Sequence, residues 1–264
     1  MKRLSVRIIF TQNRERLITL GLVVAFLAFW EGIARAGMAS PLIFPAPSKI
    51  FISFFVSLEK GKFTQDALLS LFRILSGFLV GGGAGLILGL ILGWSRRVRR
   101  IIDPIVAALH PIPKLALLPM VLIFFGLGEI SRTVMVSISA FFPMLINTMV
   151  GVVQINPTYY EVVQNYGARR LDIFRLVVLP GSLPFVMSGA RLSLKSALTT
   201  TIAVEMVFGH NGLGSLLWLA WETMRMTDLY SAIFIVAFIG ICLTLTLEWS
   251  KRFLIPWHHE NRPS

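Results

Sequence analysis

Charged residues are scarce in this chain of 264 residues, at 14% against the roughly 25% that is usual in soluble domains. Hydrophobic residues make up 55% of it. So little charge cannot cover a water-facing surface of this size, which excludes an ordinary cytosolic enzyme. The 25 Lys and Arg exceed the 13 Asp and Glu and give a net charge of +12. Nucleic-acid-binding surfaces are also basic, but they lie on charge-rich solvated faces. The composition therefore predicts a membrane protein with no nucleic-acid partner.

The chain also lacks the residues that most catalytic sites need. Its single cysteine, Cys242, lies in an apolar run and has no intrachain disulfide partner. No glycine-rich segment is followed by the Lys-Ser/Thr of a phosphate-binding loop. The four histidines form no metal-binding or catalytic set; they are His110, His210, His258 and His259. We therefore expect no enzyme activity, no metal and no cofactor in this chain.

Apolar runs that approach the length of a bilayer crossing, about 20 residues, occur six times. The predicted spans are residues 17–36, 74–93, 112–127, 133–153, 183–208 and 230–249. Together they form one six-helix transmembrane domain over residues 17–249. A segment over residues 1–16 precedes it and a tail over residues 250–264 follows it. The predicted fold class is therefore an all-α polytopic membrane protein.

Basic residues predict the orientation of these spans, because cytoplasmic segments carry an excess of Lys and Arg. Six spans place both termini on one side. With the N-terminus inside, fifteen basic residues fall in cytoplasmic segments and four in outer loops. Both termini are therefore predicted to be cytoplasmic. The basic start, the apolar run and Ala34-Arg35-Ala36 also resemble a cleavable signal peptide, but Glu31 and Arg35 beside the site favour an uncleaved helix.

A stripe of glycines marks the second span at every fourth residue. Its members are Gly77, Gly81, Gly85, Gly89 and Gly93. Small residues at this spacing let a neighbouring backbone approach closely inside a membrane. The stripe fits packing within the bundle and fits a subunit interface equally well.

Prolines interrupt the third span at Pro113 and Pro119. The stretch from Asp103 to Pro119 also contains Pro104 and Pro111, just before the span. Each removes a backbone donor and disfavours a straight helix. Interrupted spans tend to line a cavity in which the freed carbonyl groups are satisfied. The pattern therefore favours a transport pathway over a simple re-entrant loop.

The fifth span carries an acid, Glu205, toward its outer end. Acids inside a membrane usually face the bundle interior, so we expect a polar partner such as Thr201, one turn back. A role in a gate and a purely structural hydrogen bond both remain open. Arg191 and Lys195 near the other end are expected to reach lipid headgroups. The candidate pathway or gate residues are Asn147, Thr200, Thr201 and Glu205.

The loop over residues 155–180 is the longest segment predicted to be cytoplasmic. Asn156-Pro157-Thr158 is typical of a helix start. Gly167 permits a left-handed turn after the first short helix. A second short helix is expected to run from Arg170 until Pro180 ends it. The segment is thus predicted to form a helix-turn-helix that serves as a docking element.

This loop resembles the coupling loop of the permease subunits of bacterial ATP-binding cassette (ABC) importers. Their motif reads Glu-Ala-Ala, three residues, Gly, nine residues, Ile, one residue, Leu-Pro. Here the Glu, Gly, Leu and Pro are in register, while valines replace both alanines and the isoleucine. The predicted coupling residues are Glu161, Val162, Val163, Gly167, Val177, Leu179 and Pro180. These valines enlarge the docking surface and leave its spacing unchanged.

Shorter segments resemble the nitrate, sulfonate, taurine and bicarbonate branch of these permeases. They are Phe44 to Ser48, Pro111 to Ala116, Phe125 to Gly128, Phe142-Pro143 with Asn147, and Glu205 with Gly212-Leu213-Gly214. The resemblance implies a type I importer fold in the bacterial inner membrane. It also implies a second permease copy, a periplasmic binding protein and two ATPase subunits that bind the ATP and Mg²⁺.

The resemblance further implies a small imported anion, namely an aliphatic sulfonate, a taurine-like compound, nitrate or bicarbonate. The alternative within this family is a heterocyclic vitamin precursor of the pyrimidine or riboflavin type. An ATPase-independent secondary transporter is a further alternative. It would need paired acids within the membrane for a coupling ion, and Glu205 alone gives little support for it.

Overall fold

The computed structural model describes residues 2–38, 40, 42–59, 61–208 and 210–256, and this part of the chain contains helices and no strand. The prediction of an all-α protein is confirmed. In chain order the elements are α1 (Lys2–Arg35), α2 (Pro47–Glu59), α3 (Lys62–Gly77), the π-helical turn η1 (Phe78–Gly82), α4 (Gly83–Trp94), α5 (Arg96–Leu109), the 3-10 turn η2 (Lys114–Leu117), α6 (Leu118–Phe125), α7 (Glu129–Val153), α8 (Pro157–Asn165), α9 (Arg170–Ile173), the π-helical turn η3 (Phe174–Val178), α10 (Leu179–Phe208), α11 (Leu213–Glu222) and α12 (Met226–Leu254).

Five helical stretches are long and apolar enough to cross a membrane. They are Leu17–Arg35, Phe63–Trp94, Glu129–Val153, Arg170–Phe208 and Met226–Leu254. A sixth candidate consists of Arg96–Leu109 and Lys114–Phe125, which meet at 90°. The break between them falls in the proline-rich segment. This sixth candidate begins at Arg96, earlier in the chain than the predicted third span, which begins at residue 112.

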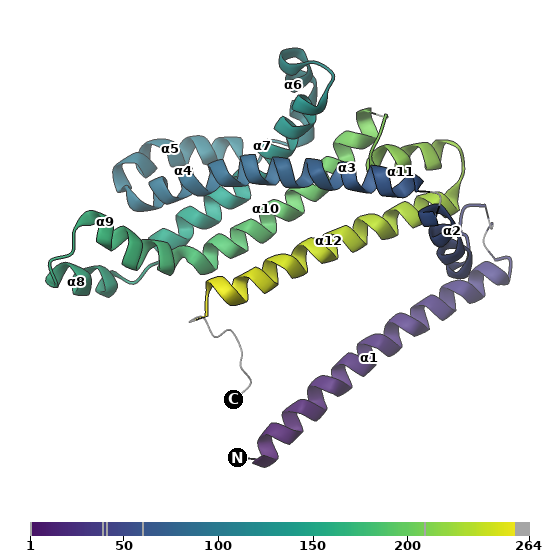
Figure 1. The fold of residues 1–264 in the computed structure, drawn as a ribbon, viewed down its shortest axis with the longest axis horizontal. Helices are drawn as coiled ribbons and strands as arrows, with labels where there is room; N and C mark the ends of the chain where they lie inside the picture. The colour runs from purple at the N-terminus through teal and green to yellow at the C-terminus, as the bar shows by residue number, and fades with distance from the viewer. Residues whose placement is uncertain (1, 39, 41, 60, 209, 257–264) are drawn as a thin grey trace.

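Figure 1 shows how these helices are arranged. The continuous α3–η1–α4 helix, α7, α10 and α12 run alongside one another and form the body of the molecule. The α8–α9 hairpin lies at one end of this body, and α2 and α11 lie at the other (Figure 1). Helix α6 projects sideways from the body (Figure 1). Helix α1 starts apart from the bundle, and its C-terminal end lies near α2 (Figure 1). The two ends of the bundle are therefore built from different short helices.

The glycine stripe packs against α7 of the same chain. A Cβ atom built on Gly81 would lie 2.0 Å from the Ser137 carbonyl oxygen, and one on Gly85 would lie 2.5 Å from that of Phe141. The two backbones are thus too close for any side chain at these positions. Of the two interpretations that the sequence left open, the structure supports packing within the chain.

The helix that begins at Arg170 does not end at Pro180, so that prediction is wrong. It continues through the π-helical turn Phe174–Val178 into α10. A π-helical turn shifts the backbone hydrogen-bond register by one residue. Pro180 therefore occupies the second position of the next α-helical segment, where a missing donor is tolerated. The result is one helical unit from the α8–α9 hairpin to Phe208.

Candidate functional site

The α8–α9 hairpin has the local features that its sequence predicts for a sharp turn. The Asn156 side chain accepts a hydrogen bond from the Thr158 amide at 3.0 Å and caps α8. Gly167 has a φ of +77°, and its amide donates to the Gln164 carbonyl at 2.9 Å. At the start of α9, the Asp172 carboxylate accepts from the Arg169 amide at 3.0 Å. Each short helix is thus fixed at its start by a hydrogen bond from a backbone amide to a side chain.

A small apolar cluster holds the hairpin onto the bundle. Ile155, Ile173 and Val177 are buried in it, with Tyr160 and Val163 packed against them. Burial raises the pKa of the Tyr160 phenol. The predicted coupling residues therefore divide into two groups, because Val163 and Val177 support the hairpin while others are exposed.

The outward face of the hairpin is rich in exposed apolar and aromatic side chains. Of the predicted coupling residues, Glu161 and Val162 on α8 are exposed, and so is Leu179 at the start of α10. Tyr159 and Tyr166, which the sequence analysis did not select, are 63% and 89% exposed. An exposed aromatic face on a short helical hairpin is typical of a protein interface. The available signal was their place in the sequence, since Tyr159 lies two residues before Glu161 and Tyr166 lies directly before Gly167.

The candidate pathway residues lie inside the helix packing. Thr200 is buried and donates to the Ser139 hydroxyl at 2.7 Å. Thr201 is buried too, and its hydroxyl is without a hydrogen-bond partner among the described residues. Asn147 is half-buried, and its amide donates to the Pro143 carbonyl of its own helix at 2.8 Å. These side chains sit where α7 and α10 pack together, so their role in transport stays a prediction.

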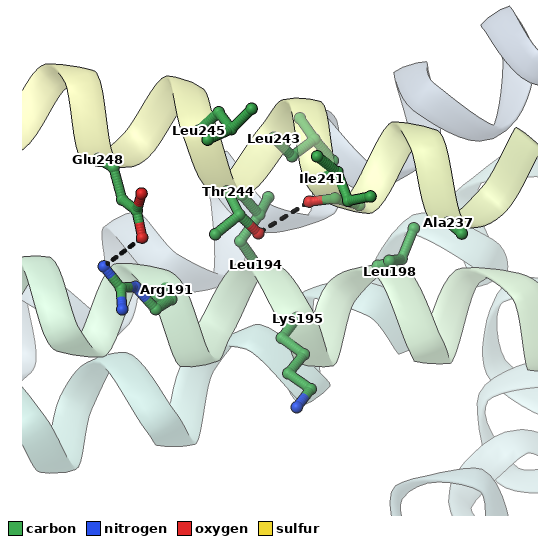
Figure 2. A pocket seen from close by; sticks show the side chains of 11 residues that line it. Arg191, Leu194, Lys195, Leu198, Ala237, Ile241, Leu243, Thr244, Leu245 and Glu248 are labelled. Carbon is green, nitrogen blue, oxygen red and sulfur yellow. Dashed lines mark hydrogen bonds and ion pairs between the residues drawn. The ribbon is translucent and has the colours of Figure 1, made fainter. Parts of the chain in front are cut away.

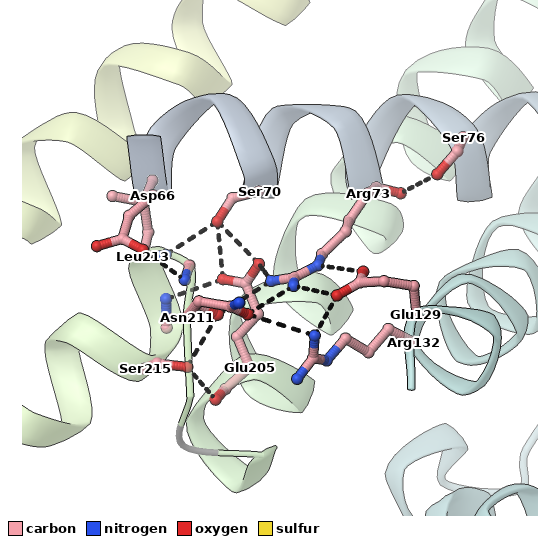
Figure 3. Close-up of polar contacts among 12 residues, drawn as sticks. Asp66, Ser70, Arg73, Ser76, Glu129, Arg132, Glu205, Asn211, Leu213 and Ser215 are labelled. Atoms are coloured by element: carbon pink, nitrogen blue, oxygen red, sulfur yellow. Dashed lines mark hydrogen bonds and ion pairs between the residues drawn. The ribbon is translucent and has the colours of Figure 1, made fainter. Parts of the chain in front are cut away.

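Glu205 lies in a buried cluster of charges at the α11 end of the bundle (Figure 3). Its carboxylate is 2.7 Å from the Arg73 guanidinium, whose side chain has no exposed surface. The Ser70 hydroxyl and the Gly214 amide donate to the same carboxylate at 2.8 Å and 2.9 Å. Its partners are thus on α3 and α11, and Thr201 is not one of them.

The cluster extends from Glu205 to α7 through Arg73. Two guanidinium nitrogens of Arg73 donate to the Glu129 carboxylate at 2.8 Å and 2.6 Å. Arg73 also donates to the Asn211 side chain at 2.8 Å, and Arg132 pairs with Glu129 (Figure 3). The opposite charges are balanced, which makes burial of the group tolerable. These contacts tie α3, α7, α10 and the start of α11 to one another.

A groove between α10 and α12 forms a cavity of about 530 Å³ (Figure 2). Arg191 and Glu248 form an ion pair across it at 3.1 Å, and both side chains are about half exposed. Figure 2 shows Lys195 extending away from α12. The charge of the groove arginine is therefore already balanced within the chain.

A second cavity, of about 480 Å³, lies where the broken span faces η1, α4 and α7. Its lining is mostly apolar and includes Ala84, Ile112, Met120 and Phe141. The one charged side chain among its described lining residues is Lys114. The proline-rich break therefore adjoins a cavity, which is the arrangement expected of irregular backbone inside a membrane.

Comparison with known proteins defines the class. The model of the family described as the binding-protein-dependent transport system inner membrane component matches residues 81–258. The chain belongs to this family, and it is therefore an inner-membrane ABC transporter permease.

Individual relatives agree with this assignment. The taurine transport system permease protein TauC of Escherichia coli (strain K12) is 30% identical over 94% of this chain and 92% of the relative. The putative aliphatic sulfonates transport permease protein SsuC of the same organism is 32% identical over 90% of each. A chain from an inward-facing structure of the MetNI methionine ABC transporter has a TM-score of 0.60 at 17% identity, over 74% of this chain and 97% of that one. The predicted importer fold is thus confirmed.

Proposed function

We propose that this chain imports a small aliphatic sulfonate or a similar small anion, which a periplasmic binding protein delivers. Two ATPase subunits with bound ATP and Mg²⁺ would drive a pair of these permease chains. The observation that carries the substrate class is the similarity, over at least nine-tenths of the chain, to permeases named for taurine and aliphatic sulfonates. A bicarbonate permease of Synechococcus elongatus is 27% identical, which keeps inorganic anions within the same class.

The α8–α9 hairpin is the element that we assign to ATPase docking. It presents Tyr159, Val162 and Tyr166 on an exposed face. The excess of basic residues in predicted cytoplasmic segments supports placing this end, and both termini, in the cytoplasm. The opposite end, with α2 and α11, would then face the binding protein.

The docking hairpin is joined to the spans by a continuous helix, which can transmit its movement. From Arg170 the chain is helical through Pro180 to Phe208. Movement of the hairpin when ATPase subunits close on ATP would therefore be carried along α10 to Glu205 at the far end. This is alternating access, in which a partner favours one of two states of the permease. The buried charge cluster joins α10 and α11 to Arg73 of α3 and Glu129 of α7, and it would pass this movement on to those helices.

Copurification with the ATPase tests the docking assignment. Gly167→Pro should abolish association, because proline cannot adopt the φ of +77° and would remove the amide that donates to Gln164. Val162→Asp should also weaken it by placing a charge on the exposed face without straining the backbone. Gly126→Pro is the matched control, since Gly126 also has a positive φ and a bonded amide but lies after α6. Unchanged ATPase association in both hairpin variants would contradict the assignment.

The substrate class can be tested on the cognate binding protein. A thermal-shift screen against alkanesulfonates, nitrate, bicarbonate and pyrimidines should show stabilisation by sulfonates. Ligand that binds only the folded state raises the apparent stability by mass action. Stabilisation by pyrimidines alone would contradict the anion proposal and favour a vitamin precursor.

A further inference from the structure

The cavity at the broken span lies near mid-length of the helices that surround it. Val80 and Gly81 line it from the central part of the Phe63–Trp94 stretch. On the other side are Leu109 and Lys114, one from each side of the 90° break, and Ile112 from the break itself. A cavity of about 480 Å³ is within the size range of small-molecule sites. This place is therefore deep enough in the spans for a solute to be bound during crossing.

Lys114 is unusually placed for a charged residue. Its ammonium group lies 5.0 Å from the centre of the Phe142 ring and donates to the His110 carbonyl. No carboxylate is among the described residues that line the cavity. Charged side chains at membrane depth usually face a cavity or pathway and have a functional role. The positive charge of Lys114 is thus not neutralised by any described residue that lines the cavity, and it can attract an anion there.

We propose that Lys114 binds the acidic head of the imported solute, and that an alkanesulfonate is the class that fits. This rests on the proposed function, and it adds the contact residue and a preference. The hydrocarbon part would lie against Ile112, Met120 and Phe141, whose side chains line the same cavity. Nitrate and bicarbonate have no such part. Taurine carries an ammonium group, for which the described lining offers no carboxylate.

A charged thiol reagent measures this preference without requiring transport. The probe is 2-sulfonatoethyl methanethiosulfonate, which is itself a short alkanesulfonate, and it is compared with the trimethylammonium analogue. Met120→Cys provides the target thiol in the cavity, and Cys242→Ala removes the exposed native thiol. Labelling rates are measured on the full chain in complex with its ATPase, with and without ethanesulfonate.

Lys114→Met should slow the sulfonate reagent at the Met120→Cys thiol by about tenfold, the factor that corresponds to about 1.4 kcal/mol, and should not slow the cationic reagent. Lys114→Arg should restore the rate. Lys195→Met is the matched control and should change nothing, because Lys195 lines the α10–α12 groove. In the protein with Lys114, ethanesulfonate should protect the thiol better than taurine or bicarbonate does.

Equal sulfonate labelling in the Lys114 and Lys114→Met proteins would overturn the site. Equal protection by ethanesulfonate, taurine and bicarbonate would overturn the preference. Uptake of sulfonate by the unmodified complex in vesicles is a separate readout of the proposed function. Uptake with unchanged labelling would therefore reject Lys114 alone, while protection without uptake would reject the sulfonate as the transported solute.

Discussion

Removing Arg73 from the charge cluster should destabilise the protein strongly. In Arg73→Met the Glu205 carboxylate, which is 1% exposed, loses its buried positive partner. The hydrogen bonds from Ser70 and Gly214 remain but do not neutralise it. Breaking one side of a buried ion pair costs about 3–5 kcal/mol. Glu129 is 50% exposed and can turn toward solvent, so the loss of its contact with Arg73 should add little to the destabilisation.

The free energy of unfolding can be measured by SDS titration in detergent, with helix content followed by circular dichroism. Arg73→Met should lower it by about 3–5 kcal/mol. The double variant Arg73→Met with Glu205→Gln should recover part of that loss, because the remaining side chain is then neutral. Arg191→Met is the control, since its pair with Glu248 is half exposed and such pairs contribute about 0–1 kcal/mol.

Two results would refute this reasoning. A loss of less than about 1 kcal/mol, the range of an exposed pair, would show that Arg73 does not compensate a buried charge. A double variant that loses the full sum of its two single variants would show that Arg73 and Glu205 act independently.

The remaining predictions concern single positions. Gly81→Ala should lower the free energy of unfolding in the same SDS titration by about 1–3 kcal/mol or more, because the added methyl group overpacks against the Ser137 carbonyl. Gly83→Ala should leave it unchanged, because no atom lies within 4 Å of a Cβ at that position. Asn156→Ala should cost about 0.5–2 kcal/mol of local stability and speed hydrogen exchange in α8; unchanged exchange would show that the cap is dispensable. Burial raises the pKa of Tyr160. The neutral phenol therefore makes its full contribution to hairpin stability below about pH 10, and this contribution is lost as the pH rises through the raised pKa. Tyr160→Phe should lack this alkaline loss when exchange or tyrosine absorbance is followed, and an identical pH profile would contradict the prediction.

The sequence predicted the helical class and the turn at Gly167 because these depend on local chemistry. Runs of apolar residues require helices in a membrane, and a positive φ favours glycine. The motif that identified the coupling loop is local too. These features needed no knowledge of what packs against them.

The sequence could not predict the features that depend on distant partners. The predicted second span, residues 74–93, begins directly after Arg73, yet the helical stretch already begins at Phe63 and includes Arg73. Glu205 and Glu129 compensate the charge of this arginine. Pro180 was expected to end a helix, and the π-helical turn before it allows the helix to continue. The glycine stripe was visible, but only the structure shows that it faces α7 of the same chain.

The cavity at Lys114 illustrates the same limit. The prolines around it predicted an interrupted span, and Lys114 itself was part of a segment selected by resemblance. That this lysine faces a mostly apolar cavity follows from the 90° break, which brings Lys114 opposite Ser137 and Phe141. Sequence spacing alone gives no such angle.

Uptake in reconstituted vesicles tests the central claim most directly. The permease is reconstituted with its ATPase, the binding protein is added on the outer face, and labelled ethanesulfonate is followed with and without internal ATP. Accumulation that requires ATP, the ATPase and the binding protein is the predicted result. Sulfonate uptake by the permease alone, without any ATPase subunit, would contradict it and identify a secondary transporter.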